Sequence, residues 1–482
     1  MFDYSRKQDK FQDFIDTPFK TRIYYHIFLN GDDHMDIKIN MPDGAKNIIK
    51  VLKDQGFEAY VVGGCVRDAL LGRDAHDWDI TTSAKPDEIK KIFKKTIDTG
   101  IKHGTVTVLM GDAYEVTTYR LDGEYTDHRR PEEVTFTTKL SEDLLRRDFT
   151  INAMAYNDEE GLVDLYDGMG DIKRKVIRCV GVAENRFDED ALRILRAVRF
   201  SAQLGFSIDP DTKLAIESKR KFLKDISAER IREELTKLIC SPHPERLLDA
   251  ASLGITAIVL PEFDSMLAME QNNPHHIYTV GMHAMKAVEA QVDMDVVEPA
   301  MRWGMLLHDI GKLYCKTTDE AGVDHFKGHP QEGLAPAREI LSRLKFDNAT
   351  IDRVLRIVLW HDLGLSGDLT KKALRRAINK MGGAEHIPDI LVARKCDALA
   401  QNPAYLNDSL SAIDRFKAMY EEIKAADDCL SLKDLTVNGS DLIAAGITPG
   451  KEIGRILNEM LADVLEEPEH NEKEYLMEKY VR

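Results

Sequence analysis

The chain has 482 residues, of which 43% are hydrophobic and 31% are charged. This length suggests about three domains at roughly 150 residues each, and the longest apolar run falls short of the ~18 residues that cross a bilayer, which excludes a membrane protein. Acidic residues outnumber basic ones by 83 to 66, which excludes a generally basic nucleic-acid binder and confines any RNA contact to a local basic patch.

The N-terminal segment, residues 1–34, mixes charges and aromatics without the apolar stretch or cleavage site of a secretory signal. We expect a disordered leader or a misassigned start there, and a cytoplasmic protein. The 6 cysteines are scattered and form no CxxC pair, so we expect reduced thiols rather than a disulfide framework or a thiolate zinc site.

The rest of the chain divides into a β-rich part and a helical part. Residues 35–181 hold short β-rich runs such as EAYVVGG and TVTVLMG between Gly, Asp and Asn turns, which predicts an α+β head with a small mixed sheet. After Arg186 apolar residues recur at helical spacing, and strands almost disappear. We expect a helical neck (182–262), a helical body (263–405) and a helical tail (406–482).

The string GGCVRDALLGRDAHDWDI is the strongest local signal in the head. Gly63 and Gly64 end a strand before a helix and let backbone approach a triphosphate, while Arg67 adds positive charge at the helix start. Asp77 and Asp79 lie two apart at the next strand start, where alternate residues face one side. Two such carboxylates can hold divalent cations, with Mg²⁺ the natural ion for oxygen ligands. The sequence therefore predicts a catalytic nucleotide site.

Further motifs extend this signal and resemble the class II nucleotidyltransferases, the family of CCA-adding enzymes and bacterial poly(A) polymerases. LLRRDFTINAMAYN resembles the ribose-binding motif, which makes Arg147 and Asp148 the candidates to contact the nucleotide sugar. RFDEDALRILRAVRF resembles the base-reading motif, and SAERIREELTKLI the helix that supports it. The resemblance covers residues 60–239 and implies a polymerase-β-like head.

The base-reading motif contains Asp190 and Arg193, three apart on a predicted helix and therefore on one face. An Asp acceptor beside a forked Arg donor complements cytosine and adenine and opposes the reversed patterns of uracil and guanine. We therefore predict a protein template that selects CTP and ATP. The alternative is a surface salt bridge between the two residues.

The stretch DGEYTDHRRPEEV joins Gly and Pro to several charges and predicts a mobile loop beside the active site. The resemblance implies that such a loop serves addition of the terminal A, which argues against an enzyme that adds only CC.

The helical body contains a second constellation, in the strings VGMHAMKAV, MLLHDIGK, GHPQEG, VLWHDLG and ARKCDALAQN. Imidazole and carboxylate together bind transition metals well. The strings resemble the HD phosphohydrolase superfamily in its HDIG form, which implies Mn, Ni, Co or Fe and hydrolysis of a phosphomonoester or cyclic phosphodiester. Matched by residue, the ligands are His283, His308, Asp309 and Asp397, with His329 and His361 for a second metal and His276 and His325 as further candidates.

These motifs together predict a template-independent tRNA nucleotidyltransferase that adds C, C and A to the tRNA 3′ end from CTP and ATP, with an additional HD activity. We expect a monomer or homodimer that binds neither DNA nor membrane. The enzyme alternatives are an A-adding enzyme, which shares every motif, and a poly(A) polymerase, which usually has a basic, phenylalanine-containing string where this chain has GRDAHDWDI. Two alternatives belong to other functional classes. One is an HD nucleotide phosphohydrolase that uses the head domain as a sensor, and the other is a noncatalytic RNA-binding protein.

Overall fold

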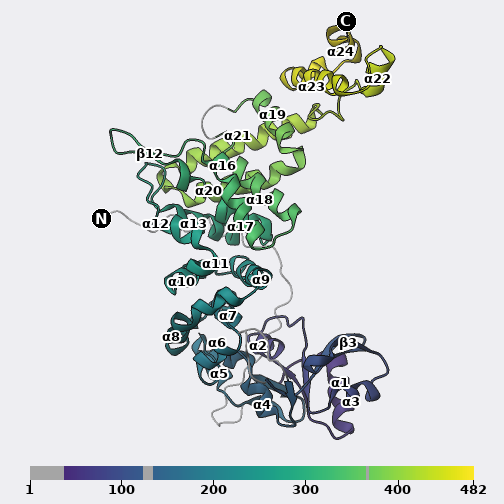
Figure 1. The fold of residues 1–482 in the computed structure, drawn as a ribbon, viewed down its shortest axis with the longest axis vertical. Coiled ribbons are helices and arrows are strands. Elements are labelled where there is room, and N and C mark those ends of the chain that lie inside the picture. The colour runs from purple at the N-terminus through teal and green to yellow at the C-terminus, as the bar shows by residue number, and fades with distance from the viewer. Residues whose placement is uncertain (1–36, 123–133, 365–368, 482) are drawn as a thin grey trace, which may run out of the picture. The chain divides into compact units, whose positions relative to one another are not determined.

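The computed structural model describes residues 37–122, 134–364 and 369–481 (Figure 1). The predicted leader and the centre of the loop DGEYTDHRRPEEV lie outside the described residues. The chain forms two compact units: the first contains the described residues up to Arg120 together with Phe136–Leu144 and Asn152–Leu165, and the second contains most of the remainder. Within the described ranges, no helix combines the length and apolarity needed to cross a membrane.

The first unit is built on a seven-stranded mixed sheet with the strand order β3-β4-β5-β2-β1-β8-β9. Strands β2 and β5 pair in parallel, and the other neighbours pair antiparallel. The predicted small mixed sheet is therefore confirmed. Its strands are β1 (Ala59–Val62), β2 (Ile80–Thr82), β3 (Thr96–Gly100), β4 (Thr105–Met110), β5 (Asp112–Thr118), β8 (Met154–Asn157) and β9 (Gly161–Asp164).

Helices flank this sheet and bury their apolar sides. In α1 (Asp43–Asp54) the residues Ile48 and Leu52, one helical turn apart, are fully buried. Helix α3 (Pro86–Ile92) begins with Pro86, whose fixed φ suits a first helical position, and a Glu88 side chain accepts from the Lys85 backbone N–H. Helices α2 (Gly64–Leu70) and α4 (Leu140–Leu145) complete the set.

The second unit is helical apart from short strand pairs (Figure 1). The short strands are β6 (Arg120–Asp122), β7 (Val134–Phe136), β10 (Val176–Ile177), β11 (Ser207–Ile208), β12 (Thr317–Thr318) and β13 (Asp324–His325). The helices up to the metal-ligand candidates are α5 (Gly168–Arg174), α6 (Ala183–Glu189), α7 (Leu192–Leu204), α8 (Pro210–Lys219), α9 (Ala228–Ile239), α10 (Arg246–Ser252), α11 (Thr256–Val259) and α12 (Pro261–Ala268).

The remaining helices carry the body and the tail. They are α13 (Val280–Asp293), α14 (Pro299–Leu307), α15 (Lys312–Cys315), α16 (His329–Glu332), α17 (Leu334–Arg343), α18 (Asn348–Trp360), α19 (Lys371–Met381), α20 (Ile387–Ala400), α21 (Leu406–Ala425), α22 (Gly439–Ala444), α23 (Lys451–Glu466) and α24 (Lys473–Tyr480). The α+β class and the helical remainder are as predicted. The five-segment division by residue number stays a prediction.

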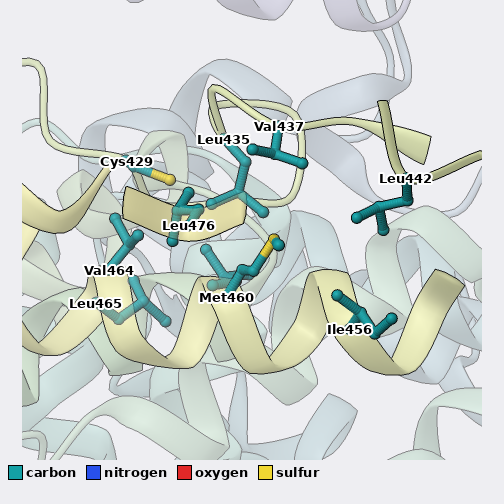
Figure 2. Packing of buried hydrophobic residues seen from close by; sticks show 10 residues of the cluster. Cys429, Leu435, Val437, Leu442, Ile456, Met460, Val464, Leu465 and Leu476 are labelled. Carbon is teal, nitrogen blue, oxygen red and sulfur yellow. The ribbon is translucent and has the colours of Figure 1, made fainter. Parts of the chain in front are cut away.

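The C-terminal helices share an apolar core of their own. Figure 2 shows Ile456, Met460 and Val464 of α23 pointing toward side chains of the preceding and following segments. Leu442 of α22 and Leu476 of α24 are both fully buried against this row. The spacing of four residues along α23 places the row on one helix face, which explains why this sequence folds into a packed tail.

Candidate active site and metal centre

The predicted catalytic aspartates lie where β1 and β2 meet. The two strands are antiparallel, so the start of β2 lies beside the end of β1, and the Val62 backbone N–H donates to the Asp79 carbonyl over 3.0 Å. Asp77 and Asp79 directly precede β2, and both are exposed. Two exposed carboxylates beside a glycine turn are a donor set that fits Mg²⁺.

The glycine turn between β1 and α2 has the conformation that the sequence implied. Gly63 has a φ of 85° and directly precedes α2, which begins at Gly64. A side chain at Gly63 would be strained in this region of φ. The Gly63 N–H donates to the Met154 carbonyl of β8 over 3.2 Å, which fixes the turn to the sheet.

Arg67, the third element of this motif, is buried. Its Nε and Nη2 donate to the Asp68 carboxylate over 2.9 and 2.8 Å, and its Nη1 donates to Asn152 Oδ1 over 2.6 Å. The guanidinium therefore joins α2 to the segment before β8, and its contribution to nucleotide binding stays a prediction.

In the second unit, the predicted ribose motif is attached to α7. Arg147 is partly buried and Asp148 is buried. Arg196 of α7 donates from Nε and Nη2 to Asp148 Oδ2 over 2.8 and 2.6 Å, and Arg193 Nη2 donates to the Arg146 carbonyl over 2.9 Å. The structure thus brings together the ribose and base-reading motifs, which are separate in the sequence.

The predicted placement of Asp190 and Arg193 on one helix is wrong. Asp190 has extended backbone, with φ −142° and ψ 102°, between the end of α6 and the start of α7. Its carboxylate pairs with Arg230 Nη2 of α9 over 2.7 Å, whereas Arg193 Nη1 pairs with Glu189 over 2.6 Å. The ion pairs found for these two residues are therefore with other partners, and the alternative of a salt bridge between Asp190 and Arg193 stays untested.

The helical body gathers the predicted metal ligands into one buried cluster. His283 lies on α13, His308 directly follows α14, and Asp397 lies on α20. His283 Nε2 is 3.1 Å from His308 Nε2 and 2.9 Å from Asp397 Oδ1. When both rings carry their proton on Nδ1, the two Nε2 lone pairs face each other and repel unless a cation lies with them, so the donor set fits a metal ion.

Asp309 connects this group to the second predicted pair. Its Oδ2 is 3.4 Å from Nε2 of both His283 and His308, while its Oδ1 is 3.3 Å from His329 Nε2 and 3.6 Å from His361 Nε2. One carboxylate thus faces two sets of imidazoles, so Asp309 belongs to both groups of residues that could hold an ion.

The four histidines are oriented alike through their other nitrogen. Nδ1 lies within hydrogen-bond distance of a backbone carbonyl in each ring, and a donating Nδ1–H leaves the Nε2 lone pair for a metal. The carbonyl oxygens are Ala400 for His283 at 3.2 Å, Met305 for His308 at 2.7 Å, Phe326 for His329 at 2.9 Å and Val358 for His361 at 2.9 Å.

The electrostatics of the cluster favour a cation. Burial disfavours a charged His308, yet Asp309 and Asp397 raise the pKa of His308 to about 10. Burial likewise opposes ionisation of Asp309, but Lys312 and His308 hold its pKa well below the usual range. The same carboxylates that stabilise a proton here would stabilise a metal ion.

Gly311 and Lys312 of the HDIGK string support the cluster. A Cβ at Gly311 would overlap the His329 carbonyl oxygen and come within 2.6 Å of the Gly333 nitrogen, so only glycine lets α16 approach this closely. Lys312 is buried, with Nζ 2.7 Å from both Asp309 Oδ2 and Gln271 Oε1.

The two remaining histidine candidates differ in position. His276 lies against the cluster, because its Nε2 is 3.3 Å from Lys312 Nζ and its ring centre is 4.9 Å from that of His283. His325 is exposed on β13 and pairs with Asp319 over 2.9 Å. The structure therefore brings His276, but not His325, to the cluster.

Several supporting residues were not predicted. Arg196 and Arg230 lie inside the motifs that the sequence displayed, but several other charged residues stand in the same motifs, so no local pattern singles them out. Gln271 has no such signal, because its role depends on a contact with Lys312 that only the fold creates.

Comparison with known protein families gives three matches along the chain. Residues 59–178 match the Poly A polymerase head domain, residues 205–267 the probable RNA and SrmB-binding site of polymerase A, and residues 331–480 the putative tRNA nucleotidyltransferase domain 2. His283, His308 and Asp309 lie between the second and third of these matched ranges.

Individual proteins are similar over nearly the whole chain. The CCA-adding enzyme of Lactobacillus delbrueckii subsp. bulgaricus is 38% identical over 87% of this chain and 93% of its own length. The crystal structure of the Bacillus stearothermophilus CCA-adding enzyme in complex with CTP has a TM-score of 0.65 and 31% identity, with 91% of this chain and 98% of that chain covered.

The fold extends to a more distant structure. The Thermotoga maritima CCA-adding enzyme complexed with tRNA has a TM-score of 0.55 at 23% identity, covering 90% of this chain and 93% of that chain. The extent and identity of the match to the Lactobacillus relative establish the family, which is the one that the head motifs resembled. The chain belongs to the CCA-adding enzymes and is a nucleotidyltransferase.

Proposed function

We propose that this enzyme adds C, C and A to the 3′ end of tRNA from CTP and ATP, with Asp77 and Asp79 as its catalytic residues. The observation that carries this assignment is that the Asp79 backbone is bonded to the end of β1, directly before the Gly63 turn, and that Asp77 and Asp79 are both exposed. The solved relative from Bacillus stearothermophilus binds CTP, and the one from Thermotoga maritima binds tRNA. A cytoplasmic location and a monomeric or homodimeric state remain predictions.

In the proposed reaction the tRNA 3′-oxygen forms a bond to the α-phosphorus of the nucleotide, and the bond from that phosphorus to the β-phosphate bridge breaks, which releases pyrophosphate. Bound Mg²⁺ would neutralise the triphosphate and favour ionisation of the attacking hydroxyl. Asp77 and Asp79 would hold the ion, and the backbone at Gly63 and Gly64 would approach the phosphates.

The ribose and base-reading motifs would position and choose the nucleotide. Arg147 and Asp148 would contact the ribose, and Arg196 would fix the Asp148 carboxylate through its two hydrogen bonds. Asp190 and Arg193 would choose the base. Because each is held by a different partner, Arg230 and Glu189 respectively, the two recognition groups are oriented before a nucleotide binds.

Steady-state nucleotide incorporation tests this assignment. Asp79→Asn should lose incorporation while its circular dichroism and melting temperature match the wild type. Full incorporation by Asp79→Asn would contradict the catalytic role.

We propose a second activity at the histidine cluster, metal-dependent hydrolysis of a phosphomonoester or cyclic phosphodiester. The observation that favours it is the bridging position of Asp309 between two imidazole pairs. Bound transition-metal ions would act as Lewis acids toward a phosphate and would make water nucleophilic at neutral pH. His283, His308 and Asp397 would hold one ion, and His329 and His361 the other, with Asp309 shared.

The test is release of inorganic phosphate from a 2′-phosphorylated nucleotide, or opening of a 2′,3′-cyclic nucleotide to the nucleoside monophosphate, by protein loaded with Mn²⁺, Ni²⁺ or Co²⁺. His308→Ala should lose hydrolysis and retain CCA addition. Loss of CCA addition in this variant would contradict the separation of the two sites.

A further inference from the structure

Arg394 of α20 is a buried cation, and two of its three guanidinium nitrogens make no hydrogen bond among the described residues. The residue is 3% exposed, and its Nη1 donates to the Leu363 carbonyl over 2.6 Å. Nε and Nη2 have no hydrogen-bond partner among the described residues. A buried charge with unsatisfied donors destabilises a fold. Such a side chain therefore indicates a ligand.

The unused atoms form the edge of the guanidinium that binds oxyanions. In Arg67 and Arg196 the same pair, Nε and Nη2, donates to a carboxylate over 2.6 to 2.9 Å. Two parallel N–H donors match the spacing of oxygens on a carboxylate or a phosphate. In Arg394 only Nη1 makes a hydrogen bond among the described residues, so Nε and Nη2 can both donate to an oxyanion.

Arg394 lines a cavity of about 120 Å³. This volume is well above the ~10–15 Å³ that holds one water. A second cation, Arg415 of α21, also lines it, and none of the described lining residues is a carboxylate. The remaining lining residues are Gly364, Leu369, Ala412, Phe416 and Met419. Two arginines, with no acid among the described lining residues, disfavour both a cationic and a purely apolar ligand, so the cavity suits an anion.

Acidic residues outside the cavity do not neutralise Arg394. Burial lowers the pKa of the guanidinium, while Asp397 and Asp362 oppose that shift from a distance. Neither acid lies within ion-pair distance of Arg394 in the described part of the chain. The Phe416 ring, 5.6 Å from the guanidinium carbon, closes one side of the group. An incoming anion would therefore supply the missing partner.

Two chain segments, α20 and the residues that follow α18, contribute both to the cavity and to the histidine cluster. Arg394 and the cluster residue Asp397 are three apart on α20 and are neighbours on that helix. The carbonyl that anchors Arg394 belongs to Leu363, two residues after the cluster residue His361. The same two chain segments thus supply metal-ligand candidates and cavity walls.

We propose that this cavity is a phosphate-binding site, in which Arg394 Nε and Nη2 and the Arg415 guanidinium bind the oxygens of one phosphate group. The binding itself depends only on the cavity. Its use, to hold a phosphate of the substrate or product of the histidine cluster, rests on the proposed hydrolase function.

Calorimetry and thermal melting of the chelator-treated full-length protein test the site, with inorganic phosphate compared with chloride at equal ionic strength. Phosphate should bind and raise the melting temperature of the wild type. Arg415→Ala should weaken binding at least tenfold. Arg394→Met should abolish the phosphate effect and melt higher than the wild type without phosphate, because the unpaired buried charge is gone.

Lys417→Ala is the matched control, since it removes another exposed cation from α21 that does not line the cavity. Its phosphate affinity should equal that of the wild type. Equal phosphate binding by the wild type, Arg415→Ala and Arg394→Met would overturn the proposal. The proposal would also fail if the wild type bound neither phosphate nor a nucleoside monophosphate.

A parallel experiment with nucleoside monophosphates distinguishes free phosphate from a phosphate group of a nucleotide substrate. Binding of inorganic phosphate that depends on Arg415 identifies a site for free phosphate, whereas binding of a nucleoside monophosphate alone, again dependent on Arg415, identifies a substrate phosphate. If phosphate or a nucleoside monophosphate binds but the metal-loaded protein hydrolyses no substrate, the phosphate-binding site is supported and only the proposed hydrolase function is contradicted.

Discussion

Arg196 binds Asp148 through two hydrogen bonds to a single carboxylate oxygen, Oδ2, at 2.8 and 2.6 Å. The two residues are 48 positions apart in the sequence, and Asp148 is buried. The pair attaches the segment of the ribose motif to α7, the helix that also carries Arg193. In the proposed function, the ribose contact of Asp148 and the base contact of Arg193 would therefore depend on one helix.

Replacement of Arg196 by Met should lower kcat/KM for CTP and ATP by roughly 10- to 100-fold, since a hydrogen bond to a charged group contributes about 1.5–3 kcal/mol. Most of the change should be a higher KM, because the variant positions the sugar poorly. Steady-state kinetics measure this effect. The conservative Arg196→Lys should recover part of the loss, and a kcat/KM within twofold of wild type in Arg196→Met would show that the pair is only structural.

Arg230 should influence base choice through Asp190, which it binds over 2.7 Å. In Arg230→Met the Asp190 carboxylate loses its orientation, so we expect the preference for CTP over UTP to fall about tenfold, roughly 1.4 kcal/mol. Misincorporation assays with single nucleotides measure it. Arg232→Met is the control on the same helix, because Arg232 contacts Lys345 and Phe346 instead. Equal misincorporation in both variants would contradict the role of Arg230.

Asp79→Asn should reduce incorporation at least about a thousandfold, which corresponds to roughly 4 kcal/mol of transition-state stabilisation from the metal. Single-turnover kinetics at saturating Mg²⁺ provide the measurement. Asp74→Asn, in the same exposed segment, should leave the rate unchanged. A comparable loss in both variants would indicate an effect of net charge rather than metal binding.

The sequence predicted the head well because its motifs are local. The Gly63 turn, the start of α2 and the approach of Asp79 to the end of β1 all follow from residues 59–82. The base-reading motif was harder. Its residues suggested one continuous helix, but Asp190 adopts an extended conformation where it pairs with Arg230 of α9, a tertiary contact that no local pattern displays.

In the histidine cluster, too, the sequence predicted the residues but not their tertiary contacts. The resemblance to the HD superfamily, carried by the HDIGK string and the ordered series of His and Asp residues, was enough to identify the six main members of the cluster. What the sequence could not predict is that Asp309 faces both imidazole pairs, or that His276 lies by Lys312 while His325 pairs with Asp319. Those facts depend on how α13, α14, α16, α18 and α20 pack.

Asp309→Asn should lower the metal content of the purified protein from about two ions per chain, the number that a bridging carboxylate implies, to less than one. The amide removes the charge that both ions would share. Elemental analysis after metal loading and desalting measures the content independently of any activity.

The control is His325→Ala, which removes an exposed histidine that pairs with Asp319 outside the cluster. It should keep the wild-type metal content. If Asp309→Asn also retained two ions, Asp309 would not be the bridge.

The central claim is that this chain builds the CCA end, and one measurement tests it most directly. Three tRNA transcripts, ending before CCA, after C and after CC, are incubated with CTP, ATP and Mg²⁺ and read at single-nucleotide resolution. The account predicts that each transcript is extended to CCA and no further, by the wild type and by Asp309→Asn alike. Extension of the CC-ended transcript alone, or unlimited addition of A, would contradict it.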